Sequence, residues 1–226
     1  MGAAAALAPA AVLLALAWAD RQRRGWAILT IAGAALYFGL REVPRFLLPA
    51  APGPIDWNWT GHLLALAGML LLALRLRPLG LAAHDFGFAR PRNLALASAV
   101  AVVVLAASFA VNELFGGRFV PIPASAWLFV AVVPGLVEET AFRGVLLAAA
   151  ERAAPAARNF AGVRVSAGTA LLTAAFILLH GPSLGMFISV LPGALLYLWL
   201  RLKTGSLLPS IVTHNLWNLL VLLAHR

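Results

Sequence analysis

Residues 133–147 read VPGLVEETAFRGVLL, which places two adjacent carboxylates and one guanidinium inside an otherwise apolar run. Hydrocarbon cannot solvate a charge, so ionisable groups persist in such runs mostly where they line a cavity or pair with one another. Residues four apart on a helix share a face, which predicts an ion pair between Glu139 and Arg143. Glu138 points about 100° away and lacks that partner. We therefore predict that Glu139 and Arg143 hold the scaffold and that Glu138 performs chemistry.

The whole chain has the composition of an integral membrane protein. Of its 226 residues, 62% are hydrophobic and 11% are charged, whereas a soluble domain is nearer half apolar and a quarter charged. There is no Cys, which excludes disulfides, a thiol nucleophile and thiolate metal ligands. The net charge of +9 lies in short clusters between apolar segments, which is typical of topology signals and contacts with anionic lipid. We predict an all-α, polytopic transmembrane helix bundle with no nucleic-acid partner.

Eight apolar segments are candidate spans, since a membrane-crossing helix needs roughly 20 mostly apolar residues. Pro134 is expected to kink or break the fifth segment. The basic clusters fall on alternate loops, so the positive-inside rule places both termini outside. These clusters lie at 21–24, 75–92, 152–164 and 201–203, and the candidate spans are 3–18, 25–40, 59–74, 93–111, 124–150, 166–180, 183–200 and 206–224.

The chain reads as a single integral membrane domain over residues 1–226. We expect N-terminal helices over 1–123 and a core that carries the candidate chemistry-bearing residues over 124–226. Abundant Ala, with Arg favoured over Lys, is typical of a GC-rich bacterial genome. We therefore expect a multi-pass protein of the bacterial inner (plasma) membrane, with the lipid bilayer as its surroundings.

Two later segments contribute histidines at comparable depth. Phe176 and His180 are four apart, as are His214 and Asn218. At about 1.5 Å rise per residue, Glu138, His180 and His214 lie roughly 20, 24 and 16 Å from the basic loop on their own segments. An imidazole can act as a base, a hydrogen-bond donor or a ligand, and an Asn amide can donate to an oxyanion. These depths are compatible with one polar cavity near the middle of the membrane.

Each signal also has a structural interpretation. A Glu–Arg pair in a bundle can serve stability alone, and a lone His at a helix end is often a packing residue. His214 and Asn218 could form interhelical hydrogen bonds. Glu138, His180 and His214 could also bind zinc, although there is no HExxH pattern and the ligands would have to converge from three helices. The conjunction of all three segments is more specific than any one of them.

The three segments together resemble the motifs of the CAAX-processing and bacteriocin-processing (CPBP) family of intramembrane proteases, which includes the type II CAAX prenyl endopeptidases. The motif Glu-Glu-x-x-x-Arg is present as EETAFR at 138–143. Phe-x-x-x-His is present as FILLH at 176–180, and His-x-x-x-Asn as HNLWN at 214–218. The resemblance covers roughly 124–224, and the first 120 residues resemble the family only in being hydrophobic.

The resemblance implies an endopeptidase that hydrolyses a peptide bond in a membrane-associated protein or peptide, with no cofactor. The implied roles are water activation by Glu138 and His180, oxyanion stabilisation by His214 and Asn218, and orientation of the first motif by Glu139 and Arg143. One alternative is a non-catalytic membrane immunity or scaffold protein of the same family. Another is a small transporter with Glu138 as a proton carrier, against which the sequence shows no internal repeat.

Overall fold

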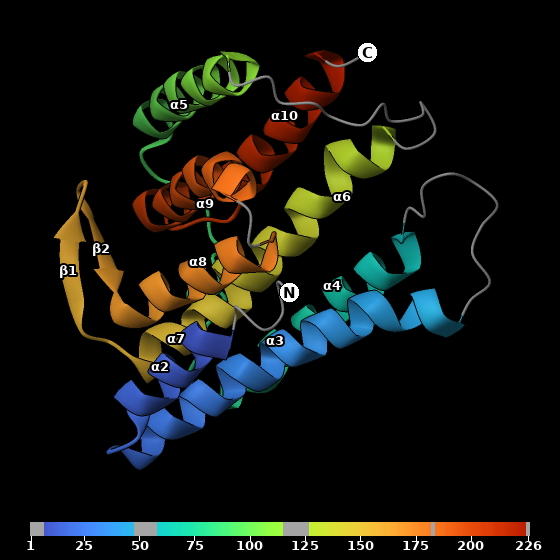
Figure 1. The fold of residues 1–226 in the computed structure, drawn as a ribbon. Helices are drawn as coiled ribbons and strands as arrows, with labels where there is room; N and C mark the ends of the chain where they lie inside the picture. The colour runs from blue at the N-terminus through green and yellow to red at the C-terminus, as the bar shows by residue number, and fades with distance from the viewer. Residues whose placement is uncertain (1–6, 48–57, 115–126, 182–183, 225–226) are drawn as a thin grey trace.

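The computed structural model describes residues 7–47, 58–114, 127–181 and 184–224. Helices dominate this part of the chain, and each of the eight predicted segments contains one (Figure 1). The predicted all-α membrane bundle is therefore confirmed. The helices are α2 (Leu7–Ala17), α3 (Arg21–Leu47), α4 (Trp59–Leu76), α5 (Leu94–Leu114), α6 (Trp127–Glu139), α7 (Leu146–Ala153), α8 (Ala167–Leu179), α9 (Leu184–Thr204) and α10 (Leu208–Ala224), with a short 3-10 helix at Arg77–Leu79.

Four helical segments in the described residues are long and apolar enough to cross a membrane. They are Arg21–Pro44, Trp59–Leu79, Leu94–Val111 and Phe187–Thr204. The apolar helices α2, α8 and α10 are shorter. The protein is thus a multi-pass membrane protein, whereas the number of eight spans and the placement of both termini outside stay predictions.

The run that carries the carboxylates forms one continuous helical rod through the bundle. α6 continues through Pro134 and ends at Glu139, and a π-helical turn at Thr140–Val145 joins it to α7. In this wider turn the Leu146 N–H donates to the carbonyl oxygen of Ala141, five residues earlier. Such turns occur frequently at functional sites. The helix is therefore not broken at Pro134, and its irregular turn directly follows the two carboxylates.

A β-hairpin replaces the basic loop that was expected between the fifth and sixth segments. β1 (Ala157–Phe160) pairs antiparallel with β2 (Val163–Ser166). The two turn residues, Ala161 and Gly162, both have positive φ, of 47° and 74°. This is the conformation that a two-residue hairpin turn requires, because it matches the twist of the strands. Strands of four residues carry too little alternation for the sequence to predict them.

The basic loops meet at one end of the molecule, where Figure 1 shows the hairpin beside α7 and α8. Nη2 of Arg152 donates to the Gly80 carbonyl at 2.8 Å, and its guanidinium lies 5.3 Å from the Trp26 ring centroid. Nη2 of Arg201 donates to the Asp85 carbonyl at 2.7 Å. These contacts join the start of α3, the loop after α4, the end of α7 and the end of α9. The predicted grouping of basic clusters is thus present in the fold.

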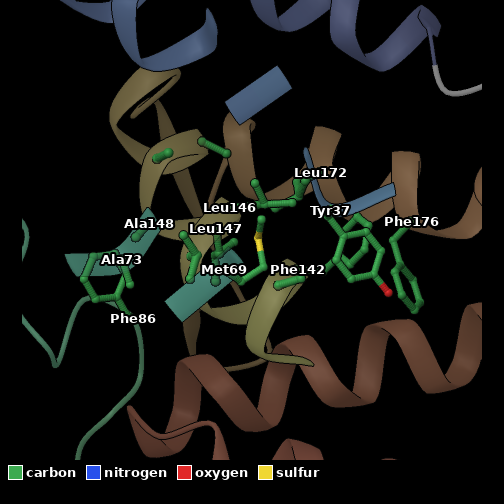
Figure 2. Packing of buried hydrophobic residues seen from close by; sticks show 14 of the residues in the cluster. Tyr37, Met69, Ala73, Phe86, Phe142, Leu146, Leu147, Ala148, Leu172 and Phe176 are labelled. Atoms are coloured by element: carbon green, nitrogen blue, oxygen red, sulfur yellow. The ribbon is translucent and has the colours of Figure 1, made fainter. Parts of the chain in front are cut away.

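The N-terminal helices pack directly against the carboxylate-bearing rod. α3 lies along α4 and α7, and α4 contacts α6. Figure 2 shows the resulting core, in which the rings of Tyr37, Phe142 and Phe176 gather beside Met69 and Leu146. The helices before residue 123 therefore help to build the surroundings of the site.

Candidate active site

Glu139 is the centre of a buried polar cluster at the end of α6. Its side chain is fully buried, and its two oxygens face different partners. Oε1 lies 2.9 Å from Nδ1 of His214 on α10, and Oε2 lies 3.5 Å from Nε of Arg143 in the π-helical turn. The predicted Glu139–Arg143 pair is therefore present, and the same carboxylate orients a histidine from a distant part of the chain.

Arg143 is held from three sides and is 2% exposed. Its guanidinium carbon lies 3.9 Å from the centroid of the Phe176 ring, a cation–π contact, and Nη2 donates to the Ala194 carbonyl at 3.3 Å. Within the described part of the chain, Arg143 Nη1 and Glu139 Oε2 lack a hydrogen bond of standard geometry. Burial of these groups costs free energy that the ion pair must offset. Removing either partner would leave an uncompensated buried charge.

His214 is fixed by two neighbours, Glu139 and Tyr197, and the sequence predicted neither contact. Its ring stacks on Tyr197, with centroids 4.7 Å apart and planes at 10°, and Ser210 Oγ donates to the Tyr197 carbonyl at 2.8 Å. A carboxylate oxygen can only accept a hydrogen bond, so Nδ1 of His214 is the nitrogen that donates to Glu139. Nε2, the other ring nitrogen, is not used in this contact. Glu139 and Tyr197 together thus set the tautomer and the plane of His214.

Glu138 points away from this cluster and lines a cavity together with His180. The cavity has a volume of about 330 Å³. Nδ1 of His180 lies 2.8 Å from the Phe176 carbonyl oxygen, so this nitrogen carries the proton and Nε2 is the basic atom. The lining residues come from α3, α6, the π-helical turn and α8, and they are Tyr37, Phe38, Arg41, Glu138, Phe142, Phe176, Leu179 and His180. The cavity therefore combines one carboxylate with one imidazole.

Two residues of α3 complete the polar part of this cavity, and sequence reasoning missed both. Tyr37 is fully buried; its hydroxyl interacts with the Arg41 guanidinium and makes no hydrogen bond of standard geometry to a described residue. Arg41 pairs with Glu42, with Nε 3.0 Å from Oε1, and interacts electrostatically with Glu138. The available signal was Arg41 itself, an arginine between two candidate spans on the side that the positive-inside rule predicts to carry few basic residues.

Pro134 disturbs the backbone bonding of α6, and two Asn side chains of α10 compensate for it. Proline lacks an N–H, so it cannot bond to the carbonyl of Val130 four residues earlier. Nδ2 of Asn218 donates to that carbonyl at 3.3 Å, and the Gly135 N–H donates to Oδ1 of Asn215 at 3.1 Å. α10 thus holds α6 one turn before the carboxylates. The oxyanion role of Asn218 stays a prediction, and its amide is bound to the main chain in this structure.

The residues that could have bound zinc are divided between these two regions. Glu138 and His180 line the cavity, whereas Nδ1 of His214 is engaged by Glu139. Among the described residues, no group of three or more His, Asp or Glu side chains is arranged to hold a metal ion. The donor set on the cavity wall is one carboxylate and one imidazole, and the mechanism without a metal stays a prediction.

Residues 120–220 match the family model described as type II CAAX prenyl endopeptidase Rce1-like. The matched range contains all three motifs, together with Tyr197 and Asn215, whereas Tyr37 and Arg41 lie outside it. No curated protein and no solved structure matches the chain.

Proposed function

We propose, from the match of residues 120–220 to the family model described as type II CAAX prenyl endopeptidase Rce1-like, that the protein is an intramembrane endopeptidase of that family. The observation that carries the proposal is the cavity that Glu138 and His180 line together, on α6 and at the end of α8. A carboxylate and an imidazole that line the same cavity are the groups that peptide hydrolysis by activated water needs. The substrate is a membrane-associated protein or peptide.

In the proposed reaction Glu138 acts as the general base. Its carboxylate removes a proton from a water molecule that the basic Nε2 of His180 also holds by accepting a hydrogen bond. The water oxygen attacks the carbonyl carbon of the scissile bond and forms a tetrahedral intermediate. Glu138 then returns the proton to the amide nitrogen as the C–N bond breaks. A base and acid of this kind contributes typically 10²–10⁴ in rate.

The tetrahedral oxyanion needs a hydrogen-bond donor, and two sets of donors are close by. The family resemblance assigns this task to His214 and Asn218, but Asn218 can serve only if its amide leaves the Val130 carbonyl. The Tyr37 hydroxyl and the Arg41 guanidinium already line the cavity. We assign them a share of the oxyanion stabilisation, because preorganised donors in a water-poor site contribute the most.

The buried cluster has a supporting part in this proposal. Arg143 and His214 hold Glu139, and the Glu139 backbone is continuous with that of Glu138, so the cluster sets where the catalytic carboxylate points. We also propose that the protein lies in the inner (plasma) membrane of a bacterium, which the Ala-rich, Arg-rich composition and the alternating basic loops support.

The experiment that tests the proposal compares membrane and secreted proteomes of three strains and maps new protein termini by mass spectrometry. The strains express the wild type, Glu138→Ala, and the control Glu113→Gln on α5, a helix that contributes nothing to the cavity lining. Precursors that accumulate uncut only with Glu138→Ala support the protease and identify its substrate. Identical proteomes, combined with a phenotype on deletion of the gene, would instead support the non-catalytic immunity or scaffold function.

A further inference from the structure

A second cavity, larger than the one that Glu138 lines, lies outside the candidate active site. It is an open, almost wholly apolar groove of about 830 Å³ between α8 and α9, and the β-hairpin closes one end. α8 contributes small side chains, including Ala170 and Ala174, whereas α9 contributes larger ones such as Leu195. α8 separates the groove from the cavity that His180 lines, so the two are distinct.

The groove has the length of an extended lipid chain. Its lining on α9 runs from Phe187 to Leu202, and fifteen residue steps at 1.5 Å correspond to about 22 Å along the helix axis. α9 is also one of the helices long enough to cross a membrane. The groove therefore runs along most of α9, starting from the end of the helix that carries Arg201 and Lys203.

A cationic mouth distinguishes this groove from an ordinary lipid-facing surface. Arg158 on β1 is exposed and lines the groove, and it is the only charged residue in the lining. Lys203 lies beside the hairpin turn, with Nζ 3.4 Å from the position that a Cβ at Gly162 would occupy. The sequence from residue 152 to 169 contains no acidic residue. The nearby Glu151 accepts a hydrogen bond from Thr169 Oγ1 at 3.1 Å.

The hairpin is held over the groove. Nε1 of Trp199, which lines the groove, donates to the Ala161 carbonyl in the turn at 2.9 Å. Trp is favoured at the level of lipid headgroups, and the exposed Phe160 beside it also lines the groove. Arg158 is thus presented at the depth of the interface by a structure that is tied to α9.

We propose that this groove binds an anionic phospholipid, with one acyl chain along α8 and α9 and the phosphate at Arg158 and Lys203. The apolar walls exclude a polar ligand, and the basic mouth favours a negatively charged headgroup over a neutral one. Basic pockets between membrane helices are known to bind anionic headgroups in this way. The site requires no catalytic activity, so its test is independent of the proposed protease function.

The test titrates delipidated protein with dioleoyl-phosphatidylglycerol or dioleoyl-phosphatidylcholine and counts bound lipids by native mass spectrometry. The wild type should bind the anionic lipid more tightly. Arg158→Gln should weaken that binding about fivefold, the contribution of one cation near a membrane surface, and should leave the neutral lipid unaffected. Arg75→Gln, an exposed charge on α4, is the matched control and should bind as the wild type does.

A second pair of variants tests the groove itself. Ala174→Phe fills the groove and should reduce binding of both lipids, whereas Ala99→Phe on the exposed face of α5 should not. Thermal unfolding in detergent verifies that each variant is folded. Equal affinity for the two lipids in the wild type, unchanged selectivity in Arg158→Gln, or unchanged binding in a folded Ala174→Phe protein would each overturn the proposal.

Discussion

Glu138 and Glu139 are neighbours in the sequence, yet they belong to two regions with opposite physical requirements. Glu139 is fully buried between Arg143 and His214, where each charge must keep its partner. Glu138 is half-buried and faces a cavity whose other polar groups come from α3 and from the end of α8. One residue step rotates a helix by about 100°, which is enough to place one carboxylate in a buried ion pair and its neighbour at a cavity.

Both carboxylates are stable inside the apolar bundle, for different reasons. A buried charge is stable when an opposite charge and hydrogen bonds compensate for its lost hydration. Glu139 receives this compensation from α10 and the π-helical turn. Glu138 receives part of it from Arg41 and from its access to the cavity. The two regions should therefore respond differently to substitution, in activity for Glu138 and in stability for Glu139.

The largest expected effect is on catalysis at Glu138. Glu138→Gln should lower the rate of substrate cleavage by at least about 100-fold, because the amide cannot take a proton from water. Its melting temperature should stay close to that of the wild type, since no buried ion pair is broken. The measurements are cleavage by purified protein and thermal unfolding in detergent. If Glu138→Gln unfolds the protein while Arg143→Ala does not, the two regions have been assigned the wrong way round.

The next largest effect is on stability at Arg143. Arg143→Ala removes one partner of a buried pair and should lower the free energy of unfolding by about 3 kcal/mol or more. The double variant Glu139→Gln/Arg143→Met removes both charges and should recover part of that loss. Thermal unfolding of the two proteins in the same detergent provides the comparison. Equal destabilisation by the single and double variants would show that the buried charge is not the cause.

A smaller loss of stability is expected where α10 holds α6. Asn215→Ala leaves the Gly135 N–H without its side-chain acceptor, which should cost about 1–3 kcal/mol. Gly135→Ala should destabilise as well, because its Cβ would meet Oδ1 of Asn215. The two substitutions act at one contact, so the double variant should cost less than the sum of the single variants. Strict additivity in thermal unfolding would argue against the contact.

The smallest expected effect distinguishes a donor to the reaction from a structural group. The Tyr37 hydroxyl is buried without a hydrogen bond of standard geometry to a described residue, so Tyr37→Phe should leave stability unchanged or slightly raised. If the hydroxyl stabilises the oxyanion, kcat should fall by about tenfold or more while KM changes little. Asn218→Ala should lower stability as well as activity, because Asn218 donates to Val130. An unchanged kcat in Tyr37→Phe would remove Tyr37 from the mechanism.

The helical periodicity and the three motifs predicted some of the contacts within the candidate site, whereas the chemical roles of its residues stay predictions. The i, i+4 spacing predicted the contact of Glu139 with Arg143, and the motif at 176–180 placed His180 at the end of a helix near Glu138. Such contacts lie within one helix, or follow from comparable depth in helices that cross the same bilayer. The helix break considered at Pro134 is absent, because side chains of α10 compensate for the missing N–H of the proline and the helix continues.

The sequence by itself thus determined the class of fold, the positions of the helical segments and the different directions in which two adjacent carboxylates point, because hydrophobicity and helical rotation act locally. Only the tertiary structure decided that Glu139 orients His214, that Tyr37 and Arg41 complete the cavity of Glu138, and that a groove opens beside a basic hairpin. These relations join segments that are tens of residues apart. They depend on which helix faces pack together, and a single sequence does not encode that arrangement in any local pattern.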